Sequence, residues 1–289
     1  MLSSYILLPL SLLVIIGIAG PQSYSKRILG AIGLALLAQI AIAIFAVEAA
    51  SDPAARLMGL SLSADAVSRV VLAAIGVAAI SALVALWYWT DCKTDGYRLV
   101  SLFLLSVTAM NATVLTTDLF TLYVFVEIVA IVSFVMIAFT GGSDGLEGAF
   151  KYLVMSAVAS VMMLASLAIL FMNTGTLAFG PVADYASVFA HSASVKAAVV
   201  LFVSGALIKS GLVPFHGWLP DAYEGAPAPV SVLLAGVITK ASGVYVLTRV
   251  VLSVFGLTHA GPILAAVGLV SIVVGALGAI AQTNLKRML

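Results

Sequence analysis

Long apolar stretches separated by short polar connections run along the whole of this 289-residue chain. A helix needs about 20 predominantly apolar residues to cross the hydrocarbon core of a bilayer, and most of the stretches approach that length. Nine stretches fit this description: residues 3–20, 28–47, 66–88, 98–115, 119–139, 148–172, 195–214, 230–251 and 262–282. The pattern therefore predicts an all-α protein, a polytopic transmembrane helical bundle of about nine helices.

The seventh stretch contains residues that break helices. Pro214 has no amide hydrogen to donate to the carbonyl of Ser210, its ring crowds that turn, and Gly211 adds backbone freedom. Carbonyls left unpaired at membrane depth are tolerated only where they face protein or a water-filled cavity. The connection that follows, residues 216–229, is polar, aromatic and rich in Pro and Gly. We therefore expect a broken seventh helix, with Gly211 and Pro214 at the break.

The composition agrees with a membrane protein and excludes several kinds of site. Of the residues, 63% are hydrophobic and 9% are charged, whereas soluble domains have about 25% charged residues. The net charge is +1 without a basic block, so nucleic acid is not an expected partner. Cys92 is the single cysteine, and one thiol forms no intrachain disulfide, iron–sulfur cluster or zinc site. We expect no metal, cofactor or catalytic centre in this chain.

The distribution of Lys and Arg predicts the orientation in the membrane. With the N-terminus outside, the inside loops hold seven basic residues (Lys26, Arg27, Lys93, Arg98, Lys151, Lys286 and Arg287) and the outside loops and helix edges hold four (Arg56, Arg69, Lys196 and Arg249). The first apolar stretch lacks a basic start and a small-residue cleavage site, so we expect it to be retained as a helix. The sequence thus predicts an integral membrane protein with the N-terminus outside and the C-terminus inside.

Three charged residues fall inside predicted helices. Glu127 lies eight residues into its stretch, about 12 Å below the start, and Lys240 lies ten residues into its own, about 15 Å deep. Lys209 precedes the expected break and is deeper than a snorkelling side chain would need. A charge at a helix centre costs roughly 2.5–3.5 kcal/mol on insertion scales. We therefore expect the three side chains to pair, to become neutral or to meet water.

A buried Glu–Lys pair has chemistry suited to moving protons. Burial raises the pKa of a carboxylate and lowers that of a lysine, and an opposite charge nearby reverses both effects. A pair that opens and closes therefore has two protonation states of similar energy, and a neighbouring charge can shift the balance. Lysine suits this role because its pKa moves readily on burial, unlike that of arginine. Glu127, Lys209 and Lys240 are candidates for a path that carries H⁺ or Na⁺.

Simpler interpretations of these residues stay open at this point. Glu127 and Lys209 could form a static ion pair, and Lys240 could bond to a helix C-terminus or a nearby serine. Lys151 lies at a helix start, where a solvated or snorkelling lysine is as reasonable as a proton relay. His216 falls in the polar connection after the break, where it either takes up protons from the inside water or is an ordinary loop residue.

Several motifs resemble a known family. Residues 207–231, LIKSGLVPFHGWLPDAYEGAPAPVS, strongly resemble the signature of antiporter-like subunits of respiratory complex I, Mrp-type cation/proton antiporters and membrane-bound group 4 hydrogenases. Four further segments are similar to family members: residues 118–127, 147–153, 235–249 and 282–289. The resemblance covers the chain from about residue 65 to the end. It implies a proton-conducting membrane subunit without redox centres of its own.

The resemblance also assigns roles to individual residues. Glu127 matches the essential glutamate of the family, and Lys209 matches the broken-helix lysine that this glutamate modulates. Lys240 matches the lysine that passes protons toward the central axis, and His216 matches the family's loop histidine. These assignments agree with the argument from depth, which did not use them.

Family members contain two inverted five-helix repeats, and this gives the chain an expected organisation. Residues 1–97 would be three leading helices, residues 98–251 one five-helix repeat, and residues 252–289 the first helix of an otherwise absent second repeat. The chain stops at Leu289, where family members usually continue. We expect a pump split over two polypeptides, a fragment or a pared-down member.

Three functions are compatible with these features. The leading hypothesis is a proton- or Na⁺-translocating subunit of a redox-driven complex of quinone or hydrogenase type, in the cytoplasmic (inner) membrane of a prokaryote or its equivalent. Its partners would be lipid, peripheral redox subunits on the inside face and other membrane subunits, including one that supplies the second repeat. The alternatives are a stand-alone or Mrp-like secondary cation/proton antiporter and a non-conducting scaffold half-subunit.

Overall fold

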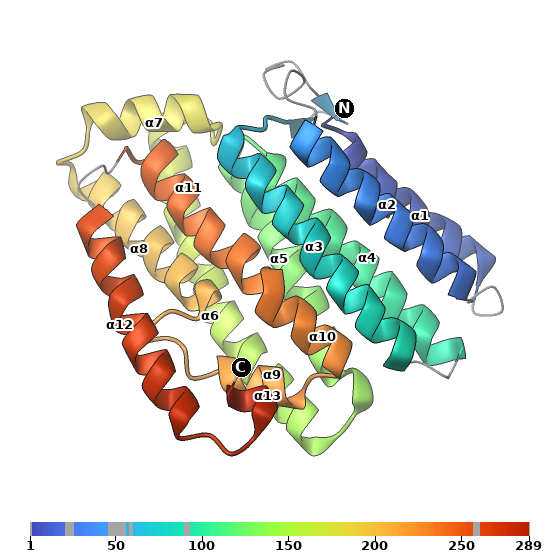
Figure 1. Ribbon diagram of the computed structural model, residues 1–289. Helices are drawn as coiled ribbons and strands as arrows, with labels where there is room; N and C mark the ends of the chain where they lie inside the picture. The colour runs from blue at the N-terminus through green and yellow to red at the C-terminus, as the bar shows by residue number, and fades with distance from the viewer. Residues whose placement is uncertain are drawn as a thin grey trace.

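The protein is an almost entirely helical bundle in the computed structural model, which describes residues 2–20, 26–45, 56–57, 60–89, 93–256 and 261–288 (Figure 1). Its α-helices are α1 (Ser4–Ala19), α2 (Lys26–Phe45), α3 (Ala66–Trp89), α4 (Lys93–Leu115), α5 (Leu119–Ile137), α6 (Ser143–Thr174), α7 (Phe179–Val188), α8 (Ala193–Ser210), α9 (Leu219–Gly225), α10 (Ala228–Leu233), α11 (Val246–Ser253), α12 (Gly261–Ile280) and α13 (Leu285–Met288). The other elements are a 3-10 turn, η3 (Ala138–Thr140), two π-helical segments, η4 (Leu234–Ile238) and η5 (Lys240–Tyr245), and two short antiparallel strands, β1 (Arg56–Leu57) and β2 (Leu60–Ser61). Cys92 and Leu289 lie outside the described residues.

The predicted polytopic bundle is confirmed. Eight spans within the described ranges are long and apolar enough to cross a membrane, and the first apolar stretch forms the shorter α1. One of these spans, Ala228–Ser253, combines α10, η4, η5 and α11. The hydropathy pattern did not predict α7, which lies across one end of the bundle (Figure 1). That helix is only ten residues long and has Gly180 and Pro181 in its first turn, so its apolar pattern was too short to recognise.

Glycines let α6 pack closely against α8 and α9. A Cβ atom added to Gly205 of α8 would lie 2.6 Å from Met163 Cγ and 2.8 Å from the carbonyl oxygen of Ala159, both on α6. A Cβ atom added to Gly148 of α6 would lie 2.6 Å from the carbonyl oxygen of Asp221 on α9. Small residues permit close backbone approach between membrane helices, where van der Waals packing drives association. The rotation of α6 relative to α8 is therefore closely defined.

Two buried amides fasten the leading helices to α4. Gln39 Nε2 donates to Asn111 Oδ1 at 3.1 Å, and Asn111 Nδ2 donates back to Gln39 Oε1 at 2.9 Å. The same amide groups donate to the carbonyls of Leu72 on α3, at 3.2 Å, and of Tyr5 on α1, at 2.8 Å. A polar group buried without a partner is costly, so this arrangement favours one relative position of the four helices.

The predicted broken helix is confirmed, and the break begins earlier than Pro214. α8 ends at Ser210 because Gly211 adopts the left-handed conformation, with φ of 64°, and its N–H donates to the carbonyl of Ile208 at 3.0 Å. Glycine favours this conformation because it has no Cβ atom. The indole N–H of Trp218 donates to the same carbonyl at 3.3 Å. The carbonyl of Ile208 therefore accepts hydrogen bonds from two protein groups and is not left unpaired at membrane depth.

Candidate functional site

Glu127 and Lys209 form an ion pair inside the bundle. Lys209 Nζ lies 2.8 Å from Glu127 Oε1, and the exposed fractions of the two side chains are 4% for Lys209 and 23% for Glu127. Glu127 comes from the middle of α5, and Lys209 comes from the last turn of α8. The carbonyl end of a helix carries partial negative charge. Because α8 ends one residue after Lys209, this partial charge also stabilises the ammonium group.

Two serines of α6 complete the surroundings of the ammonium group. Lys209 Nζ donates to Ser156 Oγ at 3.0 Å and to Ser160 Oγ at 3.3 Å. Ser160 Oγ also lies 2.6 Å from Glu127 Oε1 and 2.7 Å from the carbonyl oxygen of Ser156, and its single hydrogen is donated to one of these two acceptors at a time. Residues four apart share a helix face, which places both hydroxyls on the side of α6 that meets α8. The four-residue spacing of the two serines can be read from the sequence, but the face of α6 that meets Lys209 cannot.

Lys240 lies in a π-helical segment, and its ammonium group bonds to the backbone of its own helix. It begins η5, and its Nζ donates to the carbonyl of Ala235, five residues earlier. The side chain is exposed on this chain, and no contact joins it to Lys209 within the described part of the structure. The two helices nevertheless touch, since a Cβ atom on Gly243 would lie 2.5 Å from Ser210 Cα. Segments of π-helix are frequent at functional sites, and hydropathy does not reveal them.

His216 lines a cavity of about 390 Å³ between the break, α9, α12 and α13. The cavity extends from Gly211, two residues after Lys209, to Arg287 on α13. Ser271 and Gln282 contribute polar groups from the α12 side. Among the described atoms, His216 Nδ1 is buried without a hydrogen-bond partner. An imidazole with an unused nitrogen in a partly polar wall is able to bond to water there.

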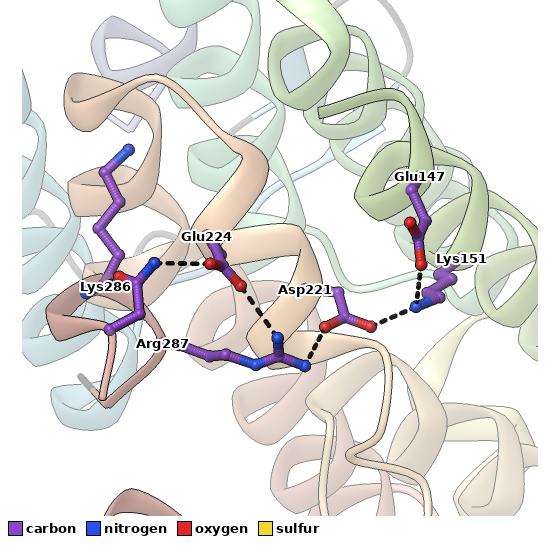
Figure 2. A network of polar contacts seen from close by, with 7 residues as sticks. Glu147, Lys151, Asp221, Glu224, Lys286 and Arg287 are labelled. Atoms are coloured by element: carbon purple, nitrogen blue, oxygen red, sulfur yellow. Dashed lines mark hydrogen bonds and ion pairs between the residues drawn. The ribbon is translucent and has the colours of Figure 1, made fainter. Parts of the chain in front are cut away.

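Lys151 belongs to a separate ionic network, shown in Figure 2. Its Nζ lies 2.6 Å from Glu147 Oε1 and 2.5 Å from Asp221 Oδ2. The other oxygen of Asp221 lies 2.5 Å from Arg287, which also bonds to Glu224 at 3.1 Å. This network joins α6, α9 and α13 at one end of the bundle. With 41% of its side chain exposed, Lys151 is a partly solvated lysine in a structural network, and its role as a relay stays a prediction.

The structure therefore divides the predicted residues into separate places. It brings Glu127 and Lys209 together and adds Ser156 and Ser160, which the sequence did not single out. The remaining predicted residues, Lys240, His216 and Lys151, lie on a neighbouring helix, in the cavity wall and in the network.

Comparison with known proteins shows what this chain is similar to. Residues 116–289 match the family described as NADH:quinone oxidoreductase/Mrp antiporter, transmembrane. NADH-quinone oxidoreductase subunit N of Hirschia baltica is 31% identical over 281 residues, which are 96% of this chain and 57% of that protein. A subunit of the Na⁺/H⁺ antiporter of Alkalihalophilus pseudofirmus is 29% identical over 235 residues, which are 80% of this chain and 47% of that protein.

A solved structure has the same fold. A chain of the membrane-bound sulfane sulfur reductase, an archaeal respiratory membrane complex, superimposes with a TM-score of 0.83 at 24% identity. The match covers 99% of this chain and 61% of that chain. The chain thus spans about half to three fifths of the length of these proteins.

Proposed function

Because the chain belongs to the NADH:quinone oxidoreductase/Mrp antiporter transmembrane family, we propose that it is a proton-translocating membrane subunit of a larger redox-driven complex. The observation that carries this proposal is the Glu127–Lys209 ion pair beside the break in α8, whose ammonium group also donates to two serine hydroxyls. The redox chemistry would belong to other subunits, and this chain would contribute the path for the ion.

The energetics of the pair favour transport over a purely structural role. Buried ion pairs add little to stability, and apolar residues of similar volume often replace them with no loss. A scaffold has no need of such a pair at membrane depth. A pair that opens, in contrast, lets Lys209 exchange a proton when a neighbouring charge changes. Carrying one charge across 100 mV requires about 2.3 kcal/mol, which a redox step supplies.

We propose that protons reach Lys209 through the cavity beside His216. Water in this cavity would lead from the end of the bundle that carries α9 and α13, which we assign to the inside, to Gly211 at the end of α8. Lys240 would receive the proton next, since its helix touches the end of α8 at Gly243. Opening of the Glu127–Lys209 pair would control the transfer.

The exposed surface formed by α12 and Lys240 is evidence for a partner within the membrane. Lys240 is exposed at membrane depth, and none of the residues of α12, within the described chain, is buried. A charged side chain facing lipid is costly. We propose that another membrane segment, of the kind that forms the second repeat in the family, covers α12 and Lys240, and that peripheral redox subunits bind on the inside face.

Replacement of Lys209 tests the proposal. The assembled complex is reconstituted in proteoliposomes, driven by its redox substrate and followed with a pH-sensitive dye. Lys209→Met should abolish proton translocation while the complex still assembles. Lys196→Met is the matched control, because Lys196 lies in the first turn of the same helix and is exposed. Normal pumping by Lys209→Met would refute the proposal, and cation/proton exchange without a redox substrate would favour the secondary antiporter instead.

A further inference from the structure

We infer that α13 is a lid on the cavity beside His216, held closed by the ion pairs of Arg287 and released when these pairs break. The inference rests on the proposed function, because it adds control of access to the route that we propose for protons. α13 lies against α9 at one end of the bundle (Figure 1). It contributes Arg287 and Met288 to the wall of the cavity of about 390 Å³. Since the Arg287 side chain is 39% exposed, α13 lies between this cavity and the water at that end.

Side chains of α13 and of the residue before it fasten this segment to α9. Arg287 Nη2 lies 2.5 Å from Asp221 Oδ1, and its Nη1 lies 3.1 Å from Glu224 Oε2 (Figure 2). Asn284 Nδ2 donates to the other oxygen of Glu224 at 2.6 Å. Lys286 Nζ donates to the backbone carbonyl that follows α9 at 2.9 Å. All of these contacts would break if α13 moved away from α9, so together they hold the lid closed.

The ion pairs of the lid are of a kind that opens easily. The side chains of Arg287 and Glu224 are 39% and 26% exposed, so water can replace the contact between them at little cost. Asp221 also lies 2.5 Å from Lys151 on α6, through its other oxygen. It therefore keeps one cation when Arg287 leaves. Opening the lid thus hydrates Arg287 and Glu224 and leaves Asp221 paired.

The segment next to the lid leaves it free to move. None of the described residues of α12 is buried, and residues 281–284, between α12 and α13, are not helical. Deeper in the cavity, His216 Nδ1 is buried without a hydrogen-bond partner among the described atoms. An open lid would admit water to this nitrogen, which is able to bond to it. The position of α13 therefore controls whether the cavity is continuous with the water at that end.

Labelling of a cysteine inside the cavity tests the inference. The complex is purified in a mild detergent and treated, without a redox substrate, with a charged methanethiosulfonate reagent. Cys92→Ser removes the single native cysteine of the chain. Gly275→Cys then places a thiol in the cavity wall, where an added Cβ atom meets nothing within 4 Å. Gly142→Cys, at an exposed position with equal space before α6, reports general access of the reagent. The rate of labelling of this chain is followed by mass spectrometry.

Variants of the ion pairs should change the labelling rate at Gly275→Cys alone. Arg287→Gln and Glu224→Gln should each raise it about threefold or more, because each removes an ion pair that closes the lid. Among the described residues, Glu224 is not part of the cavity wall, so its replacement does not enlarge the cavity directly. Lys151→Gln is the matched control, because it removes a cation from Asp221 without touching α13, and it should not raise the rate.

Salt gives an independent readout, because it weakens exposed ion pairs. In the chain with all its ion pairs, high salt should speed labelling at Gly275→Cys and not at Gly142→Cys. Equal rates at Gly275→Cys with and without Arg287→Gln and Glu224→Gln would overturn the inference, as would an equal rise in Lys151→Gln. Because labelling involves no transport, failure here leaves the loss of pumping in Lys209→Met as a separate test of the proposed function.

Discussion

Removing the charges of Glu127 and Lys209 together tests whether their ion pair serves translocation or holds helices in place. Breaking a buried pair from one side costs about 3–5 kcal/mol, whereas replacing both partners is often neutral or stabilising. Glu127→Gln should lower the free energy of unfolding by about 3 kcal/mol, at the lower end of this range, for two reasons. The carboxylate side chain is 23% exposed, and the ammonium group keeps both serine hydroxyls as acceptors.

The double variant Glu127→Gln/Lys209→Met should recover most of this loss. We expect it to be at least about 2 kcal/mol more stable than Glu127→Gln alone, which is roughly a 30-fold change in the unfolding equilibrium. The free energy of unfolding is measured by denaturant titration in a mild detergent for the wild type, both single variants and the double variant. Proton translocation is then measured for the same four proteins in their complex, and it should stay abolished in the double variant.

Two results would count against this reasoning. If the effects of the two single variants on the free energy of unfolding simply add, the ion pair carries no coupling energy. If the double variant is stable and translocates protons at the wild-type rate, the pair only holds α5 and α8 together. Lys196→Met, on the outer surface of α8, serves as the control for loss of a lysine from that helix.

Three further variants test the packing and polar contacts of the bundle by unfolding in detergent. Gly205→Ala should lower the free energy of unfolding by about 1–3 kcal/mol, because its Cβ atom would meet α6 at 2.6 Å, whereas Gly268→Ala, with open space around it, should change it by less than about 0.5 kcal/mol. Asn111→Ala should cost about 1–3 kcal/mol because it leaves the buried Gln39 amide with fewer partners; an unchanged midpoint would contradict this. Arg287→Ala should cost less than about 1 kcal/mol, because its network is partly exposed, and the loss should shrink in high salt.

The structure also shows why some features could be predicted and others could not. The depth of Glu127 and Lys209 along their helices can be read from the sequence alone, and the cost of a charge at that depth predicted that each would pair, become neutral or meet water. Gly211 and Pro214 were both predicted at the break, but the sequence did not show which of them ends the helix. The helix ends at Ser210, since Gly211 adopts a left-handed conformation there.

The sequence by itself determined that this chain is a polytopic membrane protein with charges at membrane depth, because hydropathy and residue spacing alone set which segments cross a bilayer. Only the tertiary structure decided which side chains surround those charges. Close approach at Gly205 fixes the rotation of α6 against α8, and this rotation turns Ser156 and Ser160 toward Lys209. The π-helical start at Lys240 likewise depends on packing between helices, which no local pattern of residues encodes.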